Sequence, residues 1–464
     1  CAFYAAVSDD WSRKRGGKTL IIVSDESSAY LILKIFNELG KKAEVFPYRD
    51  FGYSKISASH SYEHERLSVL DKAINGGAEV FITTPDAALQ YTIPRERLKK
   101  LSLTIKTGEE ISLDELTEKL ELLGYRRADL VEGEGQYSVR GGICDIFPPK
   151  YESPVRIEFF GDEIDRLAEF DIISQRTVKM LDCLSLTPGR EVVLSKADSE
   201  KLLGVIGTEI QKAGSEKALE ELREEYETVE TGKEAAFIDK YISVIYEEKE
   251  CLLDYFGKDT LVLIKELNAV KDRLKGYAFQ LKESEEALLR DSLILGAYAD
   301  YGKWPEYFDD FCGGRATVFC NTFTSDADRL AGLYNIKSKQ GVSYRDNLEL
   351  LREDIEHYIE LGYRINILAE NEVSARNLSG MLLDENTAST LNSEPKPGIP
   401  NIVSGVNFPP FELTLSKYVC ISLFPSVYSP GGGVRGTRKR KSKKSARERI
   451  SSYAELEIGD YVVH

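Results

Sequence analysis

The sequence predicts an α/β protein of several domains, and three features of the chain support this prediction. Residues 19–95 alternate buried-strand patterns with helix patterns, as expected for a parallel sheet covered by helices. Residues 96–190 instead carry short strands of period two that are broken by Gly and Pro. A second, smaller alternation of strands and helices covers residues 314–428. With 464 residues, the chain has room for about three domains.

The first α/β region opens on an apolar strand pattern. The elements expected there are a strand at 19–24, a helix at 26–39, a strand at 43–46, a helix at 62–74, a strand at 79–83 and a helix start at 84–86. Gly40 follows the first helix and Gly76-Gly77 the second, which is typical of helix ends. Residues 191–310 return to helix and strand patterns, with a turn into a buried strand at 254–264.

The β-rich region contains the most informative stretch, from Tyr137 to Thr177. Its pattern at Val155–Phe160 alternates with period two, which predicts a half-buried strand. The inner face would hold Val155, Ile157 and Phe159, and the outer face Arg156, Glu158 and Phe160. Gly161-Asp162 supplies a turn after this strand. A helix is expected at 112–123, before the strands.

A strand is also expected from Tyr137 to Phe147. Its alternation puts Tyr137, Val139 and Ile143 on one face, with Ser138 and Arg140 on the other. Gly141-Gly142 interrupts the pattern, which suggests a bulge or a close backbone approach.

The outward side chains Arg140, Arg156 and Phe160 allow two interpretations. They could belong to a solvated sheet face, because much of any protein surface is apolar. They could also form a binding face, because an aromatic ring beside arginine on a rigid strand is typical of an interface hot spot. The pattern alone leaves both open.

The later α/β region is expected to contain a helix at 344–361, a strand at 365–368, a helix at 372–383 and a strand at 417–423. Residues 429–433 then open a linker. The linker continues into residues 435–449, which hold nine basic residues and one acidic residue in a chain of net charge −16. This basic run could contact phosphates, but its Lys, Ser and Gly content favours a flexible linker.

Two short motifs point to enzymatic sites. Arg15–Thr19 resembles the end of a P-loop, but the first glycine is missing and a strand pattern follows where a helix is required. His60 and His64, with Glu63 between them, match a zinc motif, but no third ligand is evident. The seven cysteines form no C-x-x-C pair, which favours reduced thiols in the cytoplasm over a zinc ribbon or disulfides.

Three motifs of the β-rich region resemble a family of bacterial repair proteins. These are Arg140-Gly141-Gly142, Val155–Phe160, and Phe170-Asp171 followed by residues 174–177. They are similar to a module shared by the nucleotide-excision repair protein UvrB and the N-terminal part of the transcription-repair coupling factors. In that family the module docks onto UvrA, the damage-recognition ATPase. The resemblance implies that Arg140, Arg156 and Phe160 contact UvrA.

The resemblance also implies a domain plan. Expected are a discontinuous UvrB-like α/β domain (1–95 and 191–313), an inserted UvrA-binding module (96–190), a small α/β domain (314–428), a basic linker (429–449) and the truncated start of an RNA-polymerase-interacting, CarD-like domain (450–464). UvrB lacks the last of these, so the tail favours the coupling factors.

The function implied is recruitment of UvrA to RNA polymerase stalled at a lesion. This chain would then be a cytoplasmic docking fragment with no catalytic, nucleotide-binding or metal residues and no cofactor of its own. ATP, Mg²⁺ and most contacts with double-stranded DNA would belong to a translocase motor elsewhere in the parent protein. The alternative is a UvrB-type, nucleotide-dependent damage-verification helicase, which the missing P-loop disfavours. A metalloprotein that uses His60 and His64 is a third, weaker hypothesis.

Overall fold

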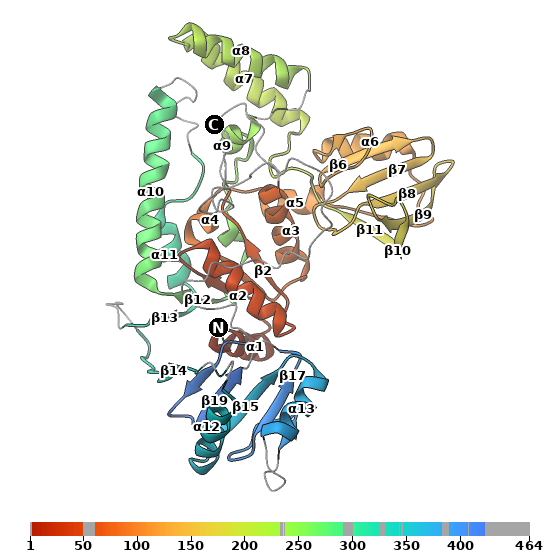
Figure 1. Ribbon diagram of the computed structural model, residues 1–464. Coiled ribbons are helices and arrows are strands. Elements are labelled where there is room, and N and C mark those ends of the chain that lie inside the picture. Colours follow the sequence, from red (N-terminus) through yellow and green to blue (C-terminus); the bar gives the residue numbers. More distant parts are fainter. Residues whose placement is uncertain are drawn as a thin grey trace. The chain divides into compact units, whose positions relative to one another are not determined.

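The computed structural model describes most of the chain in two compact units. The described residues are 2–49, 61–232, 235, 237–290, 300–323, 330–342, 344, 347–382, 389–406 and 408–422. One unit contains the described residues from 330 onward together with 30–42, and the other contains residues 2–29 and the described part of 43–323. The architecture is α/β with several sheets, as the sequence predicts (Figure 1).

The larger unit is built around a five-stranded parallel sheet. Its strands are β1 (Thr19–Ile22), β2 (Ala43–Phe46), β3 (Val80–Thr83), β12 (Leu261–Lys265) and β13 (Ala316–Cys320), in the order β13-β12-β1-β3-β2. All four pairings are parallel. β1 and β3 are buried along their whole length, because a parallel sheet is covered on both faces.

The helices of the larger unit alternate with its strands along the chain, as the sequence predicts for residues 19–95. They are α1 (Ala2–Arg15), α3 (Ser61–Asn75), α4 (Pro85–Leu89), α5 (Arg95–Leu101), α7 (Lys196–Lys212), α8 (Glu216–Glu230), α9 (Ile242–Ile245), α10 (Leu267–Arg290) and α11 (Pro305–Gly313), with short 3₁₀ turns at Ile238–Tyr241 and Leu252–Tyr255. The helix α2 (Glu26–Glu38) starts in this unit, but its residues from 30 onward are grouped with the other unit. α1 packs on β1 and β12, α3 on β2, and α11 on β13. The predicted helices and strands of residues 19–89 are confirmed to within a few residues at each end.

Residues 103–186 form the β-rich module. Its strands are β4 (Leu103–Lys106), β5 (Arg126–Arg127), β6 (Gln136–Arg140), β7 (Ile143–Phe147), β8 (Val155–Phe160), β9 (Glu163–Phe170), β10 (Thr177–Leu181) and β11 (Cys183–Leu186). Six of them form a sheet in the order β10-β9-β8-β7-β6-β5, and β11 pairs with β4. The helix α6 (Leu113–Leu122), capped by the Ser112 side chain, packs its Leu116 and Leu120 into a core with the inner face of this sheet.

The predicted strand from Tyr137 to Phe147 is in fact a hairpin. Gly141 and Gly142 form a two-residue turn, with Gly141 at a φ of 58°, between the antiparallel strands β6 and β7. Arg140 therefore lies opposite Ile143, and both occupy the same face of the sheet. The prediction that Ile143 shares a face with Tyr137 was wrong, because a two-residue turn reverses the parity of the residues that follow it.

The smaller unit holds a second α/β arrangement. Its strands are β14 (Ser338–Gln340), β15 (Arg364–Ala369), β16 (Thr390–Leu391), β17 (Asn401–Ser404), β18 (Phe411–Leu413) and β19 (Tyr418–Ser422), in the order β14-β18-β19-β15-β17-β16. The helices α12 (Leu348–Glu360) and α13 (Glu372–Leu382) pack on it. α12 begins at Leu348 rather than 344, because the Asn347 side chain caps its first turn by accepting from the Leu350 amide.

Several predicted segments lie outside the described residues, and one strand belongs to a different sheet than predicted. The basic run at 435–449, the tail at 450–464 and His60 lie outside the described residues. The strand β13, within the range expected for the second α/β domain, pairs with β12 in the first sheet. The domain limits themselves stay a prediction. Within the described residues, no helix combines the length and apolar character needed to cross a bilayer.

A buried cluster of charges fixes the point where the chain leaves the module and returns to the first sheet. Glu191 is fully buried and accepts from Arg66 Nε at 3.1 Å and from Arg49 Nη1 at 2.8 Å. Its backbone amide donates to Glu63 Oε1 at 2.6 Å, and Arg190 Nε donates to the same carboxylate at 3.2 Å.

Two further contacts belong to this cluster. Asp239 pairs with Arg49, and the Thr92 hydroxyl donates to Glu191. Among the described residues, three arginines and three carboxylates therefore meet with little access to water, and their charges balance. Arg66 also stacks on the Phe46 ring at 4.1 Å.

Substitution of Arg66 by alanine should destabilise the larger unit strongly. The change leaves the buried Glu191 with one cation fewer, and loss of one partner from a buried ion pair typically costs about 3–5 kcal/mol. The measurement is urea unfolding followed by circular dichroism. Arg13→Ala, which removes an exposed pair with Asp9 on α1, is the matched control and should change the free energy of unfolding by less than about 0.5 kcal/mol. Equal effects of the two substitutions would contradict a structural role for the cluster.

Candidate functional site

The candidate site is the outer face of the six-stranded sheet, opposite the core that α6 covers. The strand register aligns two rows of side chains across this face. One row runs Ser138, Asp145, Arg156 and Ala168, and the other runs Arg140, Ile143, Glu158 and Arg166. The prediction that Arg140 and Arg156 lie on the same face is confirmed by this register. Ser138 also lies in the first row but is buried, so the face is not uniformly solvated.

Asp145 lies between the two predicted contact arginines. Its carboxylate is only 2% exposed. Oδ1 accepts from Arg156 Nε at 2.7 Å, and Oδ2 accepts from Arg156 Nη2 at 2.8 Å. Oδ2 also accepts from Arg140 Nη2 at 3.0 Å. One carboxylate therefore holds both guanidinium groups, in a two-point geometry with Arg156.

Arg156 also contacts two residues other than Asp145. Its Nη2 donates to Gln175 Oε1 at 2.8 Å, and its guanidinium carbon lies 4.4 Å from the centre of the Phe170 ring. The hydrogen bonds to Asp145 raise the pKa of Arg156 above its ordinary value. The side chain is only 20% exposed, so most of its polar atoms face the protein.

Phe160 differs from Arg156 in its surroundings. It ends β8 beside the turn at Gly161-Asp162, and its side chain is 82% exposed. Gly161 takes a φ of 66°, the left-handed conformation that glycine adopts without strain. The predicted outward position of Phe160 is confirmed. An aromatic ring so exposed on a strand end is available to a partner.

Further residues of this face escaped sequence reasoning. Arg166 Nη1 donates to Glu158 Oε1 at 3.2 Å, and Arg166 Nη2 donates to the Thr177 hydroxyl at 3.2 Å. The exposed Met180 of β10 lies beside Arg166, with its sulfur 3.4 Å from Nε. The sequence gives no signal for Arg166, because a regular turn at Gly161-Asp162 would bring Asp165 opposite Glu158, and a β-bulge shifts the register so that Arg166 takes this place.

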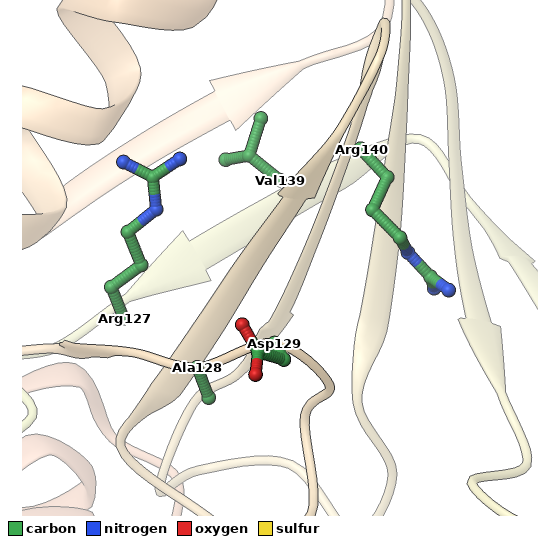
Figure 2. Close-up of a pocket in the computed structure, with 5 residues that line it drawn as sticks. All are labelled: Arg127, Ala128, Asp129, Val139 and Arg140. Atoms are coloured by element: carbon green, nitrogen blue, oxygen red, sulfur yellow. The ribbon is translucent and has the colours of Figure 1, made fainter.

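A pocket of about 530 Å³ lies at the β5 end of the same sheet, lined by Arg127, Ala128, Asp129, Val139 and Arg140. Figure 2 shows that the guanidinium groups of Arg127 and Arg140 point in different directions, on opposite sides of the strand. Arg140 thus borders both the pocket and the outer face, but its charged end belongs to the outer face, where Asp145 holds it.

The contacts of Lys18 and His64 differ from those of the P-loop and the zinc site that the two motifs resemble. β1 begins at Thr19, directly after Lys18, and the Lys18 amine donates to the carbonyl of Ala73. His64 is buried against the module, with Nε2 3.1 Å from the Gly189 carbonyl oxygen and Nδ1 3.4 Å from Glu134. Within the part of the chain that the structure describes, no group of three or more potential ligands could hold a metal ion.

Comparison with known proteins identifies the module. Residues 103–191 match the family model of the UvrB interaction domain. The chain is also 27% identical over 440 residues to the transcription-repair-coupling factor of Bacillus subtilis, and 27% identical over 435 residues to that of Staphylococcus haemolyticus. The resemblance to transcription-repair-coupling factors is confirmed. Each match covers 90% of this chain and 36% of the relative, so the chain spans about a third of the length of these coupling factors.

The register that brings Asp145 to the outer face can be tested through its neighbour Cys144. Burial raises the pKa of the Cys144 thiol to about 12, so at pH 8 almost none of it is thiolate, whereas Cys183 of the same module is exposed. We expect iodoacetamide at pH 8 to alkylate Cys183 and to spare Cys144 until denaturant is added, as followed by peptide mass spectrometry. A register slip of one residue would turn Cys144 outward and Asp145 inward, and early labelling of Cys144 would reveal it.

Proposed function

We propose that the outer face of the module docks UvrA, and that the chain thereby serves transcription-coupled nucleotide-excision repair. The observation that carries the proposal is that a half-exposed arginine, Arg140, and the exposed Phe160 stand on the same face of one sheet. The match of residues 103–191 to the UvrB interaction domain supports it.

The geometry suits protein docking for two physical reasons. Arginine and aromatic residues supply most of the binding energy in protein interfaces, and they do so best when their neighbours hold them in place. Here the antiparallel strands β6 to β9 fix the backbone, and Asp145 fixes the arginines. The remaining donors of Arg140 and the Phe160 ring face outward, where a partner can reach them.

The wider role follows from the coupling-factor relatives. In this proposal the parent protein recruits UvrA to lesion-stalled RNA polymerase, uses ATP and Mg²⁺ in a motor outside this chain, and moves on double-stranded DNA. The module would be an insertion in a UvrB-like domain made of residues 1–95 and 191–313, followed by a small domain at 314–428. The contact with RNA polymerase would begin in residues 450–464, and the basic residues 429–449 would link the two parts.

Loss of either exposed contact should weaken UvrA binding without unfolding the chain. Removal of an arginine or aromatic anchor from an interface typically costs about 2 kcal/mol, or roughly 30-fold in Kd. We expect this effect for Arg140→Ala and Phe160→Ala, measured with purified UvrA by biolayer interferometry.

The matched controls for this measurement are Arg223→Ala on α8 and Phe279→Ala on α10. Both residues are exposed and lie outside the module, so their loss should leave Kd unchanged. Wild-type affinity in both module variants, or no binding by the wild-type chain at saturating UvrA, would refute the proposed function.

The UvrB-type helicase stays the alternative and makes an opposite prediction. If the chain is a docking fragment, its ATP hydrolysis should not exceed background, with or without DNA, because Lys18 leads into β1 and its amine is held by Ala73. A coupled-enzyme assay measures this. Lys18→Ala is the control: hydrolysis that disappears in this variant would favour the helicase.

A further inference from the structure

We propose that Asp145 is the positioning residue of the docking face, and that Arg156 acts mainly through it rather than by reaching the partner. This inference rests on the proposed function, because it assigns roles within the same face. It adds a residue that lies outside the three predicted contacts, and it divides those contacts into two that touch the partner and one that supports them.

The hydrogen bonds of Arg156 are directed into the protein. Two of its nitrogens donate to Asp145 at 2.7 and 2.8 Å, and one of them also donates to Gln175 at 2.8 Å. Phe170 covers one side of the guanidinium plane, with the ring centre 4.4 Å away. Three of the about five N–H donors of this planar fork are used in this way, so only the two on Nη1 are left for a partner.

Arg140 has the opposite character. Among the described residues its side chain makes one hydrogen bond, from Nη2 to Asp145 at 3.0 Å, and it is half exposed. Most of its N–H groups therefore remain available. Asp145 restricts the motion of this long side chain before binding, so less conformational entropy is lost when a partner docks.

The charges also indicate which chemical group the face receives. Asp145 supplies one negative charge to the two positive charges of Arg140 and Arg156, and the neighbouring Glu158 and Arg166 balance each other at 3.2 Å. The group formed by Arg140, Asp145 and Arg156 therefore keeps about one positive charge in a chain of net charge −16. A carboxylate on the docked protein would complete the arrangement, with Arg140 as its partner.

The decisive experiment is a set of double-mutant cycles on UvrA affinity. If Asp145 and Arg156 act as one unit, each alanine variant should weaken binding by roughly tenfold or more, and the double variant should be little weaker than either single one. Asp145→Ala and Phe160→Ala should instead multiply their effects, because Phe160 does not depend on the carboxylate. Glu115→Gln, which removes an exposed carboxylate from α6 on the opposite side of the sheet, is the matched control and should change Kd by less than about twofold.

A second measurement needs no partner and keeps the inference testable if Asp145→Ala does not fold. In the wild-type chain the Arg156 Nε–H proton should exchange slowly with water in ¹⁵N-edited NMR, because it is bonded to Asp145. In Asp145→Asn its resonance should shift and broaden, while the thermal unfolding midpoint stays within a few degrees.

The outcomes separate the two proposals. If the wild-type chain does not bind UvrA, the proposed function is overturned, and the NMR signal alone decides whether Asp145 holds the arginines. If the wild-type chain binds but the effects of Asp145→Ala and Arg156→Ala multiply, the positioning role is overturned and the proposed function stands. An unchanged Arg156 signal in Asp145→Asn would also overturn the positioning role.

Discussion

The position of the module in the larger unit depends on a carboxylate that water does not reach. Glu191 must be neutralised where it is buried, because an isolated charge in the protein interior is strongly unfavourable. Arg49 and Arg66 reach it from the first α/β region, and Glu63 binds its backbone amide from α3. These contacts hold the chain at the point where it leaves the module, and they fix Arg190 and Glu191 against α3.

A second group of arginines around a buried carboxylate lies in the module, but there the numbers of positive and negative charges differ. Within the part of the chain that the structure describes, the cluster around Glu191 has as many carboxylates as arginines and is almost closed to solvent, so it suits a structural role. At Asp145 a single carboxylate serves two arginines, one of which stays half exposed. A closed and neutral cluster has nothing left to offer a partner, whereas an open one with surplus charge does. This difference separates the two sites although both consist of arginines around a buried acid.

The sequence alone could predict what depends on local periodicity. The outward positions of Arg156 and Phe160 follow from the alternation of side chains along one strand, which needs no knowledge of its neighbours. Ile143 was misplaced because the alternation was continued through Gly141-Gly142, whereas the chain turns back there and Arg140 comes to lie opposite Ile143. Asp145 was overlooked because its role arises from cross-strand register with Arg156, which is eleven residues away in the sequence.

Long-range pairing explains the remaining differences. β13 joins β12 in the first sheet although it follows the 24-residue helix α10, and no local pattern distinguishes this partner from the strands that come later. The same limit applies to the docking face, where a list of outward residues cannot tell a contact from a support. Exposure and hydrogen bonding make that distinction. The Phe160 ring is exposed and needs no polar partner. Arg156 instead donates hydrogen bonds to Asp145, and it thereby stabilises the surface on which Arg140 lies. A face built in this way is rigid before its partner arrives, so binding energy need not be used to order it.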